Sequence, residues 1–310
     1  MKLHLIKAYS KVLWLFLNPS TRKFNISNSV KDVMNVSYSN LKGNHYKLDI
    51  HYPENASGPL PIVVYIHGGG WVIGDKSSTR GYCRKLADSG YLVFNVNYGL
   101  GPKYTHPDPL HHIIAAIDWI KENCARYNGD PNKFFLAGES AGAHLASLIT
   151  CICTNEKLEK DIDAVAPLTR EQLKGAVLFC GAFDFDTALE SGFPLVKESI
   201  MGYTGSTDLK KYPLAGQVSP LHHVTENYPP VFLTSGEVDP LHKSQTMAMI
   251  QKLDSQGVEH EELLYDGTVA EASHGFHIFA KRKTAMEALD ALTDFMKRKT
   301  SDKSQPVSLG

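Results

Sequence analysis

The chain has 310 residues, of which 43% are hydrophobic, and its acidic and basic side chains nearly balance to a net charge of −1. This size and composition are typical of a globular protein with one core, so we expect residues 1–310 to form a single domain. The balanced charge, without a long basic run or an RNA- or DNA-binding motif, gives no reason to expect a nucleic-acid partner.

The N-terminal residues 1–17 predict an amphipathic helix, with apolar side chains such as Leu5 and Phe16 on one arc and Lys7 and Lys11 opposite. The apolar run is too short to span a bilayer, and no small-residue cleavage site follows it as in a signal peptide. Two interpretations stay open. We favour a cap helix that closes a pocket over an interfacial helix that contacts a membrane.

Strand and helix patterns then alternate, which predicts a mainly parallel, doubly wound sheet. An early antiparallel strand is expected at 47–52 and buried strands at 61–66 and 91–97, followed by a long helix near 111–127 and a strand at 134–137.

The first motif, His67-Gly68-Gly69-Gly70-Trp71, directly follows the buried strand at 61–66. Such a glycine-rich loop presents backbone N–H groups to the negatively charged oxygen that forms during acyl transfer. We expect Gly69 and Gly70 to supply these donors, with glycine required so that the backbone can approach the substrate.

The second motif, Gly138-Glu139-Ser140-Ala141-Gly142, lies between a strand-like run and a helix-forming run. This context predicts a nucleophile elbow, in which Ser140 stands on a sharp turn and the N–H of Ala141 completes the oxyanion hole. Glycines at 138 and 142 leave room where side chains would collide with the neighbouring strand and helix.

After a strand at 174–180, about fifty residues (181–230) separate it from the next strand, which is too many for a single crossover. This stretch carries several aromatic residues, Phe183 among them, between glycines and prolines. We interpret it as an insertion over the active site that lines the substrate pocket.

Two loops near the C-terminus supply the remaining catalytic groups. The strand at 229–235 leads to Asp239, and after a helix (243–255) and a strand (260–265) the chain reaches His274, which we expect to open the last helix. The order Ser, Asp, His is that of α/β-hydrolases. We therefore assign His274 as general base and Asp239 as its acid, in preference to the nearby Glu237.

The segments 67–75, 97–102, 138–142, 239–241 and 273–276 together resemble the hormone-sensitive-lipase-like family of α/β-hydrolase esterases. The resemblance implies an α/β-hydrolase fold with a helical cap, which we expect to consist of about 1–45 and 181–230. It also implies a reaction without metal or organic cofactor. We expect Trp71, Glu139 and Phe183 to contact the substrate.

The function predicted from these residues is a serine carboxylesterase that hydrolyses small, short-acyl esters through an acyl-enzyme, because a roofed pocket limits acyl length. An amide-directed relative, of the arylformamidase or acyl-peptide hydrolase type, stays open, since it shares the same machinery. A non-catalytic small-molecule receptor is disfavoured because the serine, aspartate and histidine are all present.

Five cysteines, at 83, 124, 151, 153 and 180, have an odd count and scattered spacing that argue against a disulfide framework. Residues two apart on a helix point away from each other, so Cys151 and Cys153 predict neither a disulfide nor a shared metal. We expect reduced thiols in a cytoplasmic protein. A homodimer stays open as an alternative to a monomer.

Overall fold

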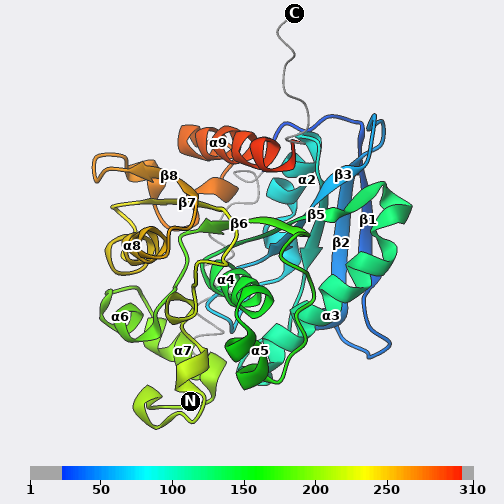
Figure 1. Ribbon diagram of the computed structural model, residues 1–310. Helices are drawn as coiled ribbons and strands as arrows, with labels where there is room; N and C mark the ends of the chain where they lie inside the picture. The colour runs from blue at the N-terminus through cyan, green and yellow to red at the C-terminus, as the bar shows by residue number, and fades with distance from the viewer. Residues whose placement is uncertain (1–22, 302–310) are drawn as a thin grey trace, which may run out of the picture.

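The computed structural model describes residues 23–301 and shows a central sheet covered by helices on both faces (Figure 1). The predicted helix at 1–17 lies outside the described residues. Within residues 23–301, eight strands form one sheet in the order β1-β2-β4-β3-β5-β6-β7-β8. Their bounds are Val30–Ser37 (β1), Lys47–Pro53 (β2), Leu60–Ile66 (β3), Leu92–Val96 (β4), Gly129–Glu139 (β5), Leu173–Phe179 (β6), Val231–Gly236 (β7) and His260–Tyr265 (β8).

Strands β3 to β8 pair in parallel, and β2 joins β4 antiparallel, which confirms the mainly parallel sheet. The central strands β3 and β4 are mainly apolar and almost entirely buried, as expected for strands that are covered on both faces. The strands predicted at 47–52, 61–66 and 260–265 are confirmed within a residue of their bounds.

One expectation was wrong. Residues 30–37, which we assigned to the cap, form β1, which pairs antiparallel with β2 at the edge of the sheet. The sequence VKDVMNVS has mostly polar or half-exposed positions. A strand at a sheet edge lacks the apolar run of a central strand, which explains why the pattern did not reveal it.

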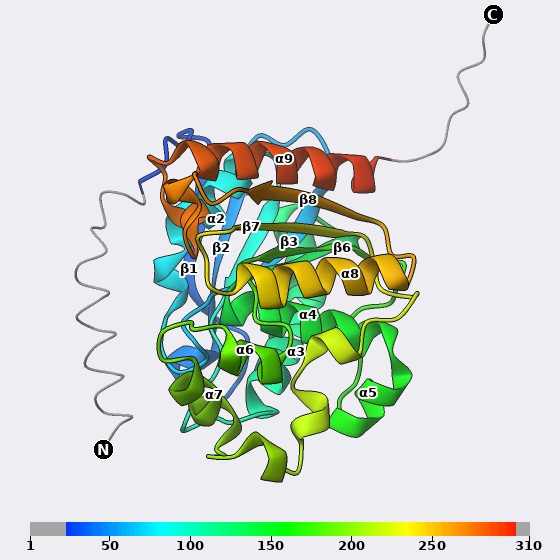
Figure 2. The same cartoon turned by 90° about the vertical axis from the view of Figure 1, so that its left-hand side faces the viewer.

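Successive side chains along a strand point to opposite faces of the sheet, so they contribute in alternation to two hydrophobic cores, one on each face. Helices α2 (Arg80–Asp88) and α9 (Lys283–Thr300) cover one face, while α3 (Asp108–Asn123), α4 (Ala141–Thr154) and α8 (Met247–Ser255) cover the other (Figure 2). On β3, for example, Val63 and Tyr65 face the first set and Ile62 and Val64 the second. The fold is therefore doubly wound.

The insertion at 181–230 holds α6 (Phe185–Glu190) and α7 (Val196–Thr204), with short 3₁₀ turns at Leu209–Lys211, Ala215–Gln217 and Pro220–His222. Both helices lie on the α8 side of the sheet, near the end where β7 and β8 terminate (Figure 2). The other helical segments of the described part of the chain are α5 (Glu156–Ile162), a π-helix at His242–Thr246, and turns at Asn44–Tyr46, Lys76–Ser78, Cys124–Tyr127, Ala270–Ala272 and Phe276–Ile278.

The last helix begins later than the sequence predicted. His274 lies in a loop, a 3₁₀ turn follows at Phe276–Ile278, and α9 starts only at Lys283. Gly275 has φ of 68°, in the left-handed region, so a helix cannot run continuously through the residue directly after His274. The histidine is therefore carried by a loop after β8, not by the first turn of a helix.

Candidate active site

Ser140 stands on the tight turn between β5 and α4, with φ of 54° and ψ of −122°. Its backbone N–H donates to the Phe179 carbonyl of β6 at 2.8 Å, which fixes the turn against the sheet. A Cβ on Gly138 would lie 2.5 Å from the Gly142 carbonyl carbon, and one on Gly142 would lie 2.0 Å from the Ile66 oxygen. These contacts confirm that both flanking glycines are required by the closeness of the strand and the helix.

Asp239 and His274 form a hydrogen-bonded pair, with 2.7 Å between His274 Nδ1 and an Asp239 carboxylate oxygen. The other Asp239 oxygen accepts from the Leu241 N–H at 3.0 Å. Burial alone would raise the pKa of Asp239, but the hydrogen bond and the charge of His274 hold this pKa below its ordinary value. The carboxylate therefore stays ionised and orients the imidazole. Because Nδ1 faces Asp239, Nε2 is the ring atom that can accept a proton.

The rival carboxylate, Glu237, has a different partner. Its side chain is exposed and accepts the backbone N–H of Gly267 at 2.9 Å, so it joins the loops after β7 and β8. This geometry supports the preference for Asp239 as the acid.

Ser140, Asp239 and His274 follow β5, β7 and β8 respectively, and these parallel strands end at one edge of the sheet. Ligands bind at this edge in doubly wound sheets. Burial raises the pKa of Glu139, the residue that precedes Ser140, and the charge of His274 is one of the effects that oppose this rise. The structure therefore brings the three predicted catalytic residues to the same end of the sheet.

The oxyanion loop (residues 67–71) reaches the elbow, because a Cβ on Gly68 would lie 3.2 Å from the Ser140 Cβ. Gly69 and Gly70 have φ of 117° and 56°. A Cβ on Gly69 would lie 2.1 Å from the Ile73 oxygen, and the Gly69 carbonyl accepts the Ile73 N–H at 3.1 Å. Glycine at 69 is thus required by the turn itself, whereas we had expected substrate approach to require it.

Both ends of this loop are tied to the protein. His67 Nδ1 donates to the Gly68 carbonyl at 2.7 Å, and its ring stacks on Tyr98. Burial lowers the pKa of His67, which keeps the ring neutral. Shortly beyond the far end, the Asp75 carboxylate accepts from the Ser77 backbone N–H and the Asn97 side-chain amide. The loop therefore has a fixed shape before any substrate binds.

Glu139 is buried beneath the loop, and one of its carboxylate oxygens accepts the Gly68 N–H at 2.7 Å. The other oxygen has no hydrogen-bond partner among the described residues. Burial raises the pKa of Glu139 to about 7, although the Gly68 N–H and Tyr65 oppose this effect. Contact of Glu139 with substrate stays a prediction, and the structure adds a role in holding the oxyanion loop.

Trp71 and Phe183, the other predicted substrate contacts, are also buried. The Trp71 indole donates to His144 Nδ1 at 3.1 Å and its ring packs against Phe185 and Tyr203 of the insertion. The Phe183 backbone N–H donates to Gln245. These contacts join the oxyanion loop and the π-helix His242–Thr246 to the insertion, and substrate contact of either residue stays a prediction.

Sequence reasoning missed Cys180, which follows β6. One donor atom each of Cys180, Asp239 and His274 lies within 4.8 Å of the other two. Burial raises the pKa of the Cys180 thiol, so the thiol stays protonated and its hydrogen bond contributes to the low pKa of Asp239. A metal would require the thiolate, which this buried position disfavours. The sequence carried no signal for this contact, because the two residues are far apart in the chain.

The insertion brings two more residues to the site. The Phe193 ring lies against the His274 imidazole, and Ser199 of α7 lies against Gly70. Phe193 was one of several aromatic residues noticed in the insertion, whereas nothing in the sequence pointed to Ser199.

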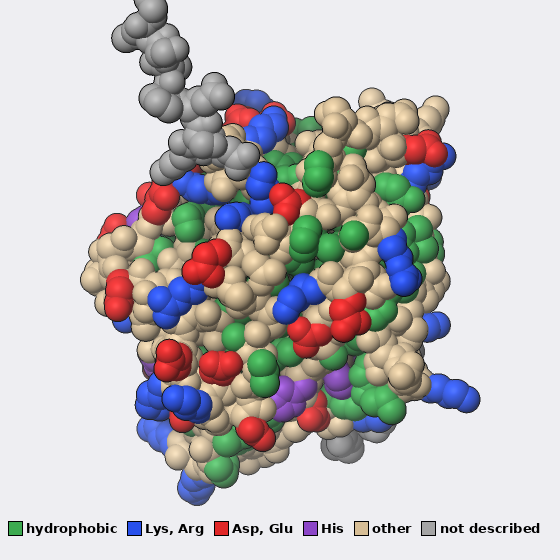
Figure 3. All heavy atoms as spheres, turned by 45° about the vertical axis from the view of Figure 1, so that its right-hand side comes forward, with side chains coloured by type: hydrophobic (Ala, Val, Ile, Leu, Met, Phe, Trp, Pro, Cys, Tyr) green, Lys and Arg blue, Asp and Glu red, His purple; other side chains and the backbone are tan. Residues whose placement is uncertain are grey.

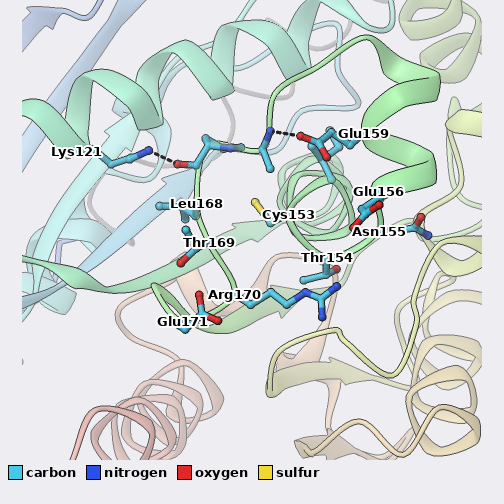
Figure 4. A pocket seen from close by; sticks show the side chains of 13 residues that line it. Lys121, Cys153, Thr154, Asn155, Glu156, Glu159, Leu168, Thr169, Arg170 and Glu171 are labelled. Atoms are coloured by element: carbon cyan, nitrogen blue, oxygen red, sulfur yellow. Dashed lines mark hydrogen bonds between the residues drawn. The ribbon is translucent and has the colours of Figure 1, made fainter.

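A hollow of about 370 Å³ lies elsewhere, at the C-terminal end of α4, between the α4–α5 junction and the loop before β6 (Figure 4). Since α4 has 14 residues, this end lies about 20 Å from Ser140. Lys121 donates to the Pro167 carbonyl and Glu159 accepts the Ala166 N–H, so these polar groups already hold the loop in place. This hollow is not part of the catalytic arrangement.

Basic and acidic side chains are interspersed over the face drawn in Figure 3, and no continuous basic field forms there. Among residues 23–301, no helix has both the length and the apolar character needed to cross a membrane.

The mainly parallel sheet, with a serine elbow and an Asp–His pair at the carboxyl ends of its strands, defines an α/β-hydrolase fold. The model of the BD-FAE family matches residues 48–253, so the chain belongs to this family, within the hormone-sensitive-lipase-like carboxylesterases.

Among curated relatives, esterase LipQ of Mycobacterium tuberculosis is 29% identical over 266 residues, which are 82% of this chain and 59% of LipQ. The chain thus spans about three fifths of that relative. Versiconal hemiacetal acetate esterase of Dothistroma septosporum is 29% identical over 252 residues, 76% of this chain and 72% of the relative. The crystal structure of esterase B from Lactobacillus rhamnosis superposes with a TM-score of 0.81 at 22% identity, covering 96% and 98% of the two chains.

Proposed function

We propose that the protein is a serine carboxylesterase that hydrolyses small, short-acyl esters. The observation that carries the proposal is the Asp239–His274 pair, with 2.7 Å between carboxylate and imidazole. The pair lies at the carboxyl ends of the parallel strands, the end of the sheet that also carries the Ser140 elbow. The names of the two curated relatives, both esterases and one of them an acetate esterase, support ester hydrolysis and a short acyl group.

In the proposed reaction, Ser140 Oγ attacks the ester carbonyl while His274 Nε2 takes the serine proton. Asp239 stabilises the imidazolium that forms. Backbone N–H groups of Gly69, Gly70 and Ala141 bind the negatively charged oxygen, and each such donor typically contributes about 3 kcal/mol to the transition state. Nε2 then protonates the alcohol oxygen as the C–O bond breaks, leaving an acyl group on Ser140. Water attacks the acyl-enzyme with His274 as base, which releases the acid and restores the serine.

The test is covalent labelling by a fluorophosphonate, followed by mass spectrometry. We expect one adduct, on Ser140, in the unaltered protein and in Ser255→Ala, a control that removes an exposed serine of α8. Ser140→Ala should not be labelled and should lose ester turnover by several orders of magnitude while it stays folded. An adduct on another serine, or unchanged turnover in Ser140→Ala, would refute the proposal.

The acyl length and the preference for esters over amides form part of the same proposal. We expect kcat/KM to fall from acetyl to hexanoyl to palmitoyl esters of one alcohol, and acetate esters to react faster than the matched acetamides. Faster reaction of the amides would favour the amide-directed alternative, and a preference for palmitoyl esters would rule out a short-acyl enzyme.

A cytoplasmic location is proposed from the cysteines. All five are buried and unpaired in the structure, as suits a reducing compartment. Thiol titration of the denatured protein, purified without reductant, should give five free thiols, whereas a lower number would indicate oxidation.

A further inference from the structure

One short segment of the cap contacts both sides of the reaction centre. The centroid of the Phe193 ring lies 4.6 Å from that of the His274 imidazole, with the rings inclined at 61°. Six residues later, the Ser199 hydroxyl lies 2.7 Å from where a Cβ on Gly70 would stand. The segment 193–199 therefore runs from the general base to the oxyanion loop.

The chemistry of ester cleavage assigns a part of the substrate to each side, provided that the proposed function is correct. The carbonyl oxygen must face the N–H groups of the oxyanion loop, next to Ser199. The alcohol oxygen must receive its proton from His274 Nε2, because Nδ1 is held by Asp239. The alcohol group therefore leaves beside the imidazole, on the side where Phe193 lies.

Phe193 is held in position by its backbone. Its N–H donates to the Ser191 hydroxyl at 3.1 Å, and its carbonyl accepts the Val196 N–H at 3.3 Å. Gly192 and Leu195, on either side, have φ of 75° and 58°, which turns the chain sharply between α6 and α7. The half-buried ring is thus presented to His274 by an ordered turn.

Exposed apolar side chains occur close in the chain to this turn and to the catalytic acid. Among the described residues, six large hydrophobic side chains are exposed, and three of them occur in the insertion near Phe193 or beside the catalytic acid: Leu189, Leu195 and Val238. Leu189 lies in the last turn of α6, Leu195 directly precedes α7, and Val238 directly precedes Asp239. Exposed apolar side chains that adjoin residues of a reaction centre in the chain favour an apolar ligand group.

We propose that Phe193 forms the wall against which the alcohol part of the ester packs, and that it selects esters whose alcohol is apolar and carries a ring. Edge-to-face contact with the phenyl group would favour an aromatic alcohol over a linear alkyl alcohol.

The test compares alcohols at a constant acyl group. Benzyl acetate and propyl acetate give the same acyl-enzyme from alcohols of similar acidity, so the ratio of their kcat/KM values measures recognition of the alcohol. We expect this ratio to fall about tenfold in Phe193→Ala, which loses an aromatic contact. In Phe193→Leu, which keeps an apolar side chain, it should fall about threefold. Val165→Ala, which truncates another exposed apolar residue on the loop before β6, should leave the ratio unchanged.

Two further measurements separate recognition of the alcohol from a position on the acyl side and from a role in positioning His274. The ratio of the kcat/KM values for ethyl acetate and ethyl hexanoate should change by less than twofold between the unaltered enzyme and the Phe193 variants. Added benzyl alcohol should compete with water for the acetyl-enzyme, regenerating benzyl acetate, less effectively in Phe193→Ala than in the unaltered enzyme.

A changed acyl preference with an unchanged alcohol preference would place the ring on the acyl side and overturn the inference. An equal loss for both alcohols would show that Phe193 acts only by positioning His274, which also overturns it. If Phe193→Ala fails to fold, Phe193→Leu decides. Absence of both ester turnover and Ser140 labelling in the unaltered protein would instead refute the proposed function itself.

Discussion

The carboxylate of Glu139 accepts the backbone N–H of Gly68 at 2.7 Å, so the residue before the nucleophile holds the first glycine of the oxyanion loop. The strand-to-helix turn and the loop that carries the expected N–H donors are thereby positioned together. A carboxylate oxygen accepts a hydrogen bond more strongly than a neutral oxygen, which makes this contact a firm link between segments 71 residues apart.

Removal of this link should impair catalysis without weakening substrate binding equally. We expect Glu139→Ala to lower kcat by about 10- to 100-fold with little change in KM, because the donors at 69 and 70 lose their fixed position. Glu139→Gln keeps an oxygen acceptor for Gly68 and should stay within about tenfold of the unaltered enzyme. Steady-state kinetics on one short-acyl ester decides, and an equal loss in both variants would contradict a role through the Gly68 contact.

The same residue should make stability depend on pH. Burial raises the pKa of Glu139 from its ordinary 4.5 to about 7, so the folded state favours the protonated acid. Its contribution to the free energy of unfolding is therefore full below about pH 4.5 and is lost as the pH rises through about 7. The loss amounts to about 3 kcal/mol.

Glu139→Gln cannot ionise and should lack this component. Urea unfolding of both proteins between pH 4.5 and 8 measures the difference in their free energies of unfolding. A constant difference across that range would show that Glu139 does not titrate as expected.

Asp239 and Glu237 lie two residues apart and should differ sharply on mutation. Asp239→Asn should lower kcat by about 10⁴-fold, because an amide stabilises the wrong imidazole tautomer and cannot balance the imidazolium charge. Glu237→Gln should stay within about threefold, since this exposed carboxylate bonds to Gly267 and not to His274. Comparable losses of kcat in the two variants would contradict the assignment of Asp239 as the acid.

Gly69 and Gly257 form a matched pair for testing the oxyanion loop. Both have positive φ, but a Cβ on Gly69 would lie 2.1 Å from the Ile73 oxygen, whereas one on Gly257 would meet nothing within 4 Å. Gly257→Ala should cost only the backbone strain of about 1 kcal/mol. Gly69→Ala should lower the free energy of unfolding by more than about 3 kcal/mol, or should distort the loop and abolish turnover. Denaturant unfolding and an ester assay on both variants check this, and equal effects would argue against the turn at Gly69.

The sequence predicted the parts of the fold whose signals are local. The apolar run of β3 and the glycines around Ser140 each predict a structure from adjacent residues, and both are confirmed. The strand patterns that precede Ser140, Asp239 and His274 sufficed to place each of them on a loop after a strand. Because parallel strands have their carboxyl ends at the same end of the sheet, the three loops were expected to lie there together.

Other features depend on contacts between distant residues. The polar edge strand β1 is defined by its pairing with β2, and the link between Gly68 and Glu139 needs both loops folded. Likewise, the approach of Phe193 to His274 depends on the path of the whole insertion. Local pattern carries no information on such distances, which is why Ser199 and Cys180 were not predicted.

The irregular edge strand has a consequence for self-association. An open sheet edge exposes unpaired peptide groups to which a second copy can add a strand. In β1 the register with β2 breaks between Val33 and Val36, where Asn35 adopts φ of 59° and its side chain accepts a hydrogen bond from Lys76. The row of outward peptide groups is therefore interrupted in the middle of a strand of eight residues. This interruption disfavours continuous pairing of a second copy's strand along β1.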